Sequence, residues 1–136
     1  FLIRHPAKVI NSYIKKNSLR NINDIGFKQQ FEIFKKIEKN KLKCVVINAD
    51  DILINPSRTI KKLCKKLNIN FSKKMLKWKK GKRKSDGIWS SVWYKDVEKS
   101  TTFSSYKSEK LYVPKKYFKI YTEALKYYER MKKYSI

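Results

Sequence analysis

The chain contains few of the residues that build disulfide frameworks and metal centres. Its 136 residues include two cysteines, Cys44 and Cys64, and a single histidine, His5. Both cysteines lie in apolar patterns, which is typical of small buried hydrophobic residues in a reducing compartment. The sequence therefore predicts no disulfide framework and no metal site, and it favours a cytoplasmic location.

Long apolar runs and glycine-rich loops are also missing. No stretch approaches the roughly 20 apolar residues of a membrane-spanning helix. Glycine occurs three times, at Gly26, Gly81 and Gly87, and these three are far too dispersed for a glycine-rich phosphate loop. Within these residues the sequence predicts neither a membrane span nor such a loop.

Acidic residues are scarce, with 11 against 35 basic residues and a formal net charge of +24. Such an excess indicates a polyanionic partner, such as nucleic acid, an anionic membrane or a phosphate-rich ligand. Thirty of the basic residues are lysine, however, and lysine, isoleucine and asparagine share A/T-rich codons, so a codon bias is the alternative explanation. The five arginines are more informative, because arginine favours bidentate phosphate recognition.

The chain reads as alternating strands and helices. The apolar pattern predicts a strand at 1–4, helices at 5–17 and 25–40, a second strand at 43–48, a turn and a helix within 49–69, and a last helix from about Pro114. Two apolar strands joined by a helical crossover should be parallel neighbours with helices packed on the sheet. The predicted fold class is therefore α/β.

The carboxyl end of the first strand is the expected binding edge of such a sheet. Arg4 lies there, and its five-donor fork suits a phosphate. Ser12 lies about 9 Å along the following helix at ~1.5 Å per residue, so a shared phosphate would lie beside the first turns, where helix amides add attraction. The alternative is that Arg4 pairs with Asp50 or Asp51 and that Ser12 merely faces solvent.

The segment "FLIRHPAKVINSY" resembles the strand–turn–helix segment of sulfotransferases, a branch of the P-loop nucleotide-binding superfamily. The family pattern is an apolar strand, Arg-x-Pro and a serine eight residues after the arginine, which Arg4, Pro6 and Ser12 match. In the family this arginine and serine hold the 3′-phosphate of the sulfuryl donor, adenosine 3′-phosphate 5′-phosphosulfate (PAPS). The resemblance implies the same roles for Arg4 and Ser12.

The resemblance continues along most of the chain. The stretch "VVINADDILINPSRTIKKLCKKLNINFSKKMLKW" is similar to the family's later strand, acidic turn and helix, and "DGIWSSVWYKDVEKSTTF" resembles a tryptophan-rich segment of a bacterial sulfotransferase-like subgroup. The implied fold is P-loop-type, with a parallel sheet between two helical layers. Residues 1–136 would form the C-terminal portion of one such domain, without its P-loop portion. No catalytic residue is assigned, because the family's base precedes the matched segment.

A later basic loop, "KKGKRKSDGIW", is similar in kind to the family's "R-K-G-x-x-G" loop, which folds over the 3′-phosphate. Arg83, Lys84 and Gly87 would fill its roles. The match departs from the pattern because Ser85 stands where the first glycine is expected and Gly81 precedes the basic pair. The alternative is a solvated lysine loop.

Three further sets of residues have a chemical and a structural interpretation. The acidic pair after the second strand is interpreted as structural rather than as a base. His5 has a natural pKa near neutrality and suits a general base, but a cap of the first helical turn is favoured. Trp89, Trp93 and Tyr94 either pack in a core, which is favoured, or line an acceptor pocket.

The predicted function is that of a sulfotransferase-like protein, which transfers a sulfuryl group from PAPS to a hydroxyl or amine. The small-molecule or carbohydrate acceptor is not identified, and no metal is expected. One alternative is a basic nucleic-acid-binding module, which the charge and aromatic content allow but no recognised motif supports. Another is a different P-loop nucleotide-using transferase or kinase.

Overall fold

The computed structural model describes residues 1–88, 90, 94–108 and 110–136. The chain divides into two compact units, each of which is described by itself. The first unit consists of residues 1–50 and 107–136, and the second of residues 51–106.

The first unit contains a small parallel sheet. β1 (Leu2–Ile3) pairs with β2 (Ile47–Asn48), with Leu2 opposite Ile47 and Ile3 opposite Asn48. The predicted strands and their parallel arrangement are confirmed, but the paired segments are shorter than the apolar runs at 1–4 and 43–48. β1 ends early because a helix begins at Pro6. A separate isolated parallel bridge joins Val46 to Ser135.

The described residues of the first unit also form three helices, and all three were predicted. They are α1 (Pro6–Tyr13), α2 (Phe27–Lys39) and α7 (Phe118–Lys132). Two short 3₁₀ turns, at Ile22–Ile25 and Lys115–Tyr117, precede α2 and α7 and were not predicted. Gly26, between the first of these turns and α2, has φ of +69°, a left-handed conformation that suits glycine.

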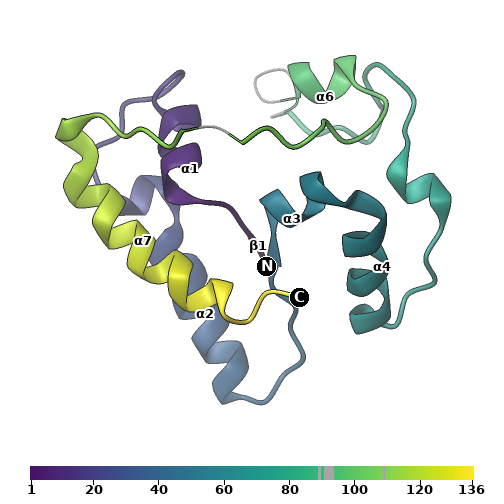
Figure 1. Cartoon of the computed structure of the whole chain (residues 1–136), viewed down its shortest axis with the longest axis horizontal. Coiled ribbons are helices and arrows are strands. Elements are labelled where there is room, and N and C mark those ends of the chain that lie inside the picture. Colours follow the sequence, from purple (N-terminus) through teal and green to yellow (C-terminus); the bar gives the residue numbers. More distant parts are fainter. Residues whose placement is uncertain (89, 91–93, 109) are drawn as a thin grey trace. The chain divides into compact units, whose positions relative to one another are not determined.

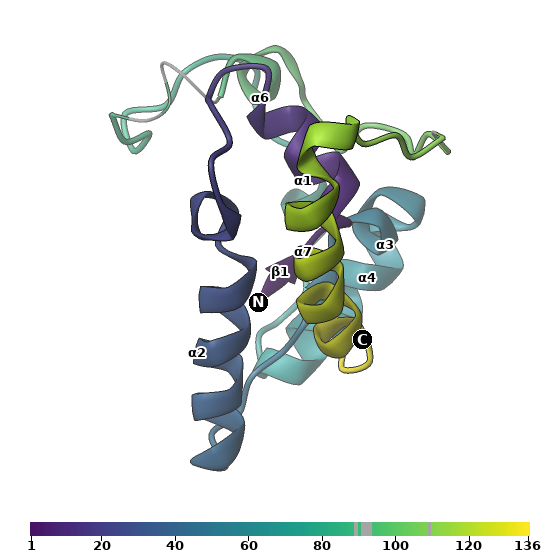
Figure 2. The same cartoon turned by 90° about the vertical axis from the view of Figure 1, so that its left-hand side faces the viewer.

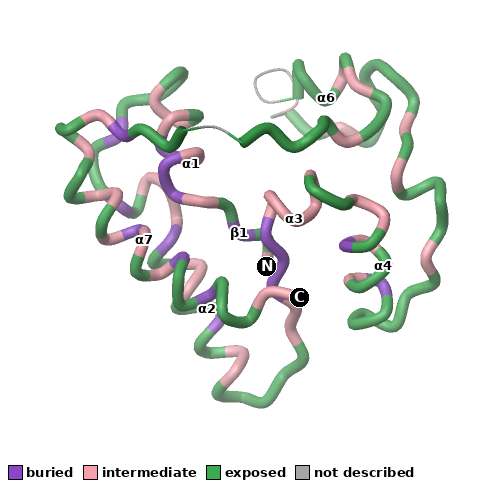
Figure 3. The backbone as a smooth tube through the Cα atoms, in the orientation of Figure 1, coloured by how far each residue is buried: buried purple, intermediate pink, exposed green. Residues whose placement is uncertain are grey.

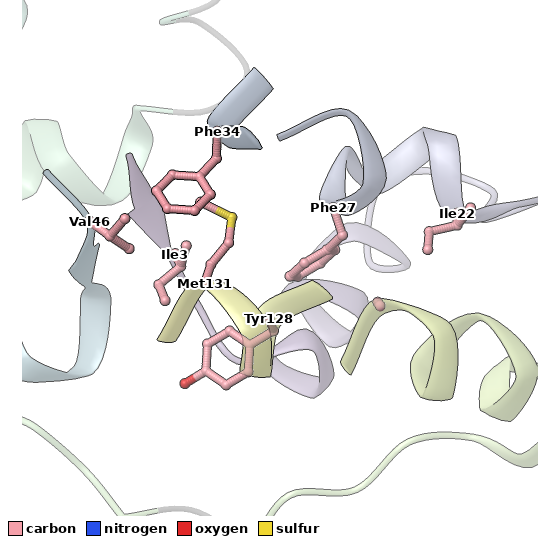
Figure 4. Packing of buried hydrophobic residues seen from close by; sticks show 8 residues of the cluster. Ile3, Ile22, Phe27, Phe34, Val46, Tyr128 and Met131 are labelled. Atoms are coloured by element: carbon pink, nitrogen blue, oxygen red, sulfur yellow. The ribbon is translucent and has the colours of Figure 1, made fainter. Parts of the chain in front are cut away.

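The core of the first unit lies between α2, α7 and β1. Figure 2 shows α2 and α7 running past each other, and the two helices are in contact. The residues of the buried cluster come from both helices, both strand segments and the turn before α2 (Figure 4): Ile3, Ile22, Phe27, Phe34, Val46, Ala124, Tyr128 and Met131. Burying a large apolar side chain contributes about 1.5–3 kcal/mol, so this cluster holds the unit together.

The second unit is built from short elements. α3 (Ala49–Ile54) begins at the end of the first unit, where the sequence predicted a turn, and is followed by α4 (Pro56–Leu67), a 3₁₀ turn at Lys73–Leu76 and α6 (Lys95–Lys99). Asn55 caps α4, because its Oδ1 accepts a hydrogen bond from the Arg58 amide at 3.0 Å. The helix predicted within 49–69 is therefore confirmed, and it begins at Pro56.

The chain thus has a mixed α/β fold that is mostly helical, with a two-stranded parallel sheet in its described part. The predicted α/β class is confirmed at this level. The P-loop-type three-layer fold stays a prediction, because two short strands do not establish it. No helix in residues 1–88, 90, 94–108 and 110–136 is long and apolar enough to cross a membrane.

Candidate functional site

Arg4 occupies the predicted binding edge. It follows β1 directly, two residues before α1 begins, and it is exposed. Figure 3 shows exposed chain near β1 and the buried start of α1. Its guanidinium group makes no hydrogen bond or ion pair with any described residue. A positive charge at the carboxyl end of a strand is therefore available to an anion from solvent.

Ser12 lies in the last turn of α1 and is exposed as well. Its hydroxyl forms no hydrogen bond with the described residues. Lys8 lies midway between Arg4 and Ser12, at intervals of four residues, so Lys8 and Ser12 share one face of the helix. α1 thus carries Lys8 and Ser12 on one face, and Arg4 lies two residues before the helix begins.

Lys8 forms an ion pair that the sequence did not reveal. Its Nζ donates a hydrogen bond to Asp50 Oδ1 at 2.8 Å, and the two side chains are only 12% and 19% exposed. Asp50 lies just after β2, so the pair links the start of α1 to the end of the neighbouring strand. The alternative pairing of Arg4 with Asp50 is therefore wrong. Asp51 belongs to the second unit, and its pairing with Arg4 stays an open alternative.

The amides of the first turn of α1 are already bonded. Pro6 has no N–H, the Ala7 amide donates to His5 Nδ1 at 3.3 Å, and the Lys8 amide donates to the His5 carbonyl at 2.9 Å. The sequence led us to expect that these amides add attraction for a phosphate. Because they have internal partners, recognition of an anion here falls to side chains.

His5 is the N-cap of α1, as favoured from the sequence. Its ring packs edge-on against Tyr128 at a centroid distance of 5.4 Å and lies 6.1 Å from that of Tyr121. Burial lowers the pKa of His5 below its usual 6.5, although the Asp50 and Glu129 carboxylates oppose the shift. Since Nδ1 accepts the cap bond, the proton of the neutral ring lies on Nε2, and this imidazole acts as a cap rather than a base.

The later basic loop lies in the second unit. Arg83, Lys84 and Gly87 are all exposed. The turn closes on itself, because the Arg83 amide donates to Asp86 Oδ2 at 2.9 Å and the Asp86 amide donates to the Arg83 carbonyl at 3.0 Å. Gly81, with φ of +105°, tethers the loop through its amide to the Glu98 carbonyl at 2.8 Å. A role of this turn in phosphate binding stays a prediction.

The aromatic candidates have different outcomes. Trp89 and Trp93 lie outside the described residues. Tyr94 is 41% exposed, so it is not a core residue.

In the described part of the chain, no three His, Cys, Asp or Glu side chains group as metal ligands would.

Comparison with known proteins adds independent information. A family model described as "Sulfotransferase domain" matches residues 1–135. Two proteins of Arabidopsis thaliana, branched-chain-amino-acid aminotransferase-like proteins 1 and 2, are 35% identical over 85% of this chain and 33% identical over 76% of it. The chain spans about a fifth of the length of these curated relatives, 19% and 18%. No solved structure matches.

Proposed function

The chain belongs to the sulfotransferase domain family, and from this premise we propose that its protein transfers a sulfuryl group from PAPS to a hydroxyl or amine of a small-molecule or carbohydrate acceptor. Within that protein, the segment from β1 to Ser12 binds the 3′-phosphate of the donor. The chain spans about a fifth of the length of its curated relatives, so the activity of the whole protein is a proposal.

The observation that carries the proposal is the guanidinium of Arg4, which has no partner among the described residues. Asp50, which follows the neighbouring strand β2, is bonded to Lys8 instead. Arg4 therefore keeps its full charge and all of its donors for a ligand. An exposed arginine at the carboxyl end of a parallel strand is placed where α/β proteins bind anions.

The residues present fit a 3′-phosphate. The planar fork of Arg4 can donate two parallel hydrogen bonds to phosphate oxygens, and the free hydroxyl of Ser12 can donate a third. The Lys8–Asp50 pair holds the helix that carries Ser12 against the strand end that follows β2. This bond occupies neither Arg4 nor Ser12, and neither side chain has a partner among the described residues.

PAPS supplies the activated sulfuryl group when it is bound. The task of this chain is to hold the donor by its remote phosphate, so that binding energy positions the reacting end. Because the amides of the first turn are bonded internally, the hold on the phosphate depends on Arg4 and Ser12. Loss of either side chain is therefore expected to weaken donor binding directly.

The later turn lies outside this proposal. The family resemblance implies a phosphate-binding role for Arg83, Lys84 and Gly87, and that role stays a prediction. All three are exposed, and the Arg83–Asp86 hydrogen bonds hold the turn in one shape. Donor binding by Arg4 and Ser12 does not require this turn and is tested without it.

Calorimetry with adenosine 3′,5′-bisphosphate tests the proposal directly. We expect Arg4→Ala to weaken binding by about 1.5–3 kcal/mol, the range for hydrogen bonds to charged groups. This loss corresponds to roughly 10- to 150-fold in Kd. Adenosine 5′-monophosphate, which lacks the 3′-phosphate, should show no dependence on Arg4.

Arg58→Ala is the matched control, since it removes the same charge from an exposed position on α4. If Arg4→Ala and Arg58→Ala weaken the bisphosphate equally, binding depends on net charge and the assigned site is wrong. A steep loss of single-stranded nucleic acid binding with salt, without bisphosphate binding, would instead favour the basic-module alternative. Displacement of the bisphosphate by ATP would favour another nucleotide-using transferase.

A further inference from the structure

The second unit contains a cavity that the donor proposal does not use. Its volume is about 590 Å³, which lies within the range of small-molecule pockets. Its apolar wall comes from five side chains that are distant in sequence: Leu53, Met75, Trp78, Val97 and Phe103. The space is large enough for a flat ring system and is lined mainly by apolar atoms.

Hydrogen bonds hold the aromatic part of this wall in place. The Trp78 amide donates to the Thr101 carbonyl at 2.9 Å, and its indole Nε1–H donates to Ser100 Oγ at 3.1 Å. The Phe103 ring meets the Trp78 indole edge to face, at 5.2 Å and 90°. The two rings therefore form a preorganised aromatic corner, as expected of a binding surface rather than of a loose loop.

The polar part of the lining is positively charged. The lining includes three basic side chains, those of Lys74, Lys77 and Arg83, and a single carboxylate, that of Asp96. The lining hydroxyls are in part engaged, since Thr102 Oγ1 donates to the Leu76 carbonyl at 3.0 Å. The Arg83 guanidinium makes no hydrogen bond with any described residue. A ligand in this cavity therefore meets an apolar corner on one side and an unpaired guanidinium on another.

We propose that this cavity binds a small molecule with a flat apolar body and an anionic group, such as an aromatic carboxylate. The ring packs against Trp78 and Phe103, and the anionic group accepts hydrogen bonds from Arg83. The identification of this molecule as the sulfuryl acceptor rests on the proposed function, but the binding of the molecule to the cavity does not. In this assignment Arg83 binds the anionic group of the cavity ligand. It does not bind the 3′-phosphate, although the family resemblance implies that role.

Binding of three probes to the chain tests this assignment by calorimetry. We expect 2-naphthoate to bind, its neutral isostere 2-naphthamide to bind at least tenfold more weakly, and acetate to show no detectable binding. Arg83→Ala should weaken 2-naphthoate at least tenfold and leave 2-naphthamide unchanged. Lys82→Ala is the matched control, because Lys82 is exposed in the same loop and does not line the cavity.

The apolar wall is tested by two variants whose folding is checked by thermal melting. Phe103→Leu should weaken both naphthalene probes, because it removes the edge-to-face corner. Val97→Trp, at a position that is 50% exposed, should fill the cavity and block both probes without disturbing a core. If Phe103→Leu does not fold, Val97→Trp alone decides the point.

Three results would overturn the proposal. They are equal binding of 2-naphthoate and 2-naphthamide, equal effects of Arg83→Ala and Lys82→Ala, and unchanged probe binding in Val97→Trp. Displacement of 2-naphthoate by adenosine 3′,5′-bisphosphate would also contradict it, because Arg83 would then belong to the donor. Failure of bisphosphate binding in a chain that still binds 2-naphthoate would reject the proposed function alone.

Discussion

The two units differ in how much apolar surface they bury. In the described part of the chain, the buried hydrophobic side chains belong to the first unit, with the exception of Cys64. Both units leave large apolar side chains exposed, and in the second unit Ile54, Leu67, Ile69, Ile88 and Val97 are 49–86% exposed without a comparable set of buried ones. One chain therefore combines a unit with a packed core and a unit held mainly by local contacts.

The difference matches the kind of site that each unit carries. In the first unit, the packed core fixes β1 and α1, and these elements place Arg4 and Ser12. In the second unit, hydrogen bonds such as that from the Trp78 indole to Ser100 hold a shallow aromatic corner beside a basic turn. Exposed apolar groups next to charged ones are typical of ligand-binding surfaces. A phosphate site needs side chains held in a fixed geometry, and the packed core of the first unit provides that rigidity.

Core truncation should show the largest difference between the units. Phe34 is 2% exposed in the centre of the first-unit cluster (Figure 4). We expect Phe34→Ala to lower the free energy of unfolding of this unit by about 3–5 kcal/mol, the usual cost of such a cavity. Native-state hydrogen exchange at the amides of α2 and α7 measures it.

The matched change in the second unit is Cys64→Ala. Cys64 is 6% exposed, and its Sγ lies 3.7 Å from Met75 Sδ. We expect a cost of about 1 kcal/mol, near the centre of the distribution for single substitutions. A loss from Cys64→Ala as large as that from Phe34→Ala would contradict the comparison, because the second unit would then depend on buried packing as much as the first.

A buried hydrogen bond should give the next largest effect. In the first unit Asn48 Nδ2 donates to the Tyr128 hydroxyl at 3.2 Å, and both residues are buried, at 6% and 2% exposure. Tyr128→Phe leaves the amide without this partner, so we expect a loss of about 1–3 kcal/mol in the free energy of unfolding, measured by urea denaturation.

Tyr127→Phe is the control for this change. Tyr127 also packs on the core, beside Phe31, but its hydroxyl makes no hydrogen bond with the described residues. The Tyr127→Phe variant should therefore show a much smaller loss in the free energy of unfolding than Tyr128→Phe. Similar losses in the two variants would mean that the Asn48 bond contributes little to the first unit.

The smallest expected effect is a pH dependence from the first unit. The pKa of His5 is lowered by burial, so the unfolded chain takes up the proton first as pH falls below 6.5. Its contribution to stability is complete above that pH and is lost as pH falls through the lower folded-state pKa. Thermal melting between about pH 7.5 and about pH 5.5 should therefore show a falling Tm.

His5→Asn tests this origin, because asparagine keeps a side-chain acceptor for the α1 cap and does not titrate in this range. The variant should lose less stability than the parent chain over the same pH interval. Parallel Tm curves for the two proteins would assign the pH dependence to other groups.

Much of the first unit could be predicted from the sequence. The 3–4 spacing of Phe27, Phe31 and Phe34 predicts α2, and Pro6 marks the start of α1, because both signals are local. The parallel order of the strands follows from the helical crossover. The length of the sheet could not be predicted, because the early start of α1 limits pairing to two residues in each strand.

The candidate site was predictable in part, and for a clear physical reason. Arg4, Ser12 and the His5 cap follow from a local segment and from its resemblance to a family. The Lys8–Asp50 pair joins residues 42 positions apart, so only the packing of α1 against the end of β2 reveals it. The cavity beside Arg83 is lined by residues 74–83 and 96–104, which are separate in the sequence. A local sequence pattern therefore could not predict this cavity.

The central claim is that the first unit binds the 3′-phosphate of a nucleotide donor through Arg4 and Ser12. The most direct test is an amide NMR titration of the chain with adenosine 3′,5′-bisphosphate. The account predicts that the largest chemical-shift changes fall on residues 4–12 and vanish in Arg4→Ala. Changes spread over lysine-rich surfaces of both units, and unaltered in Arg4→Ala, would contradict it.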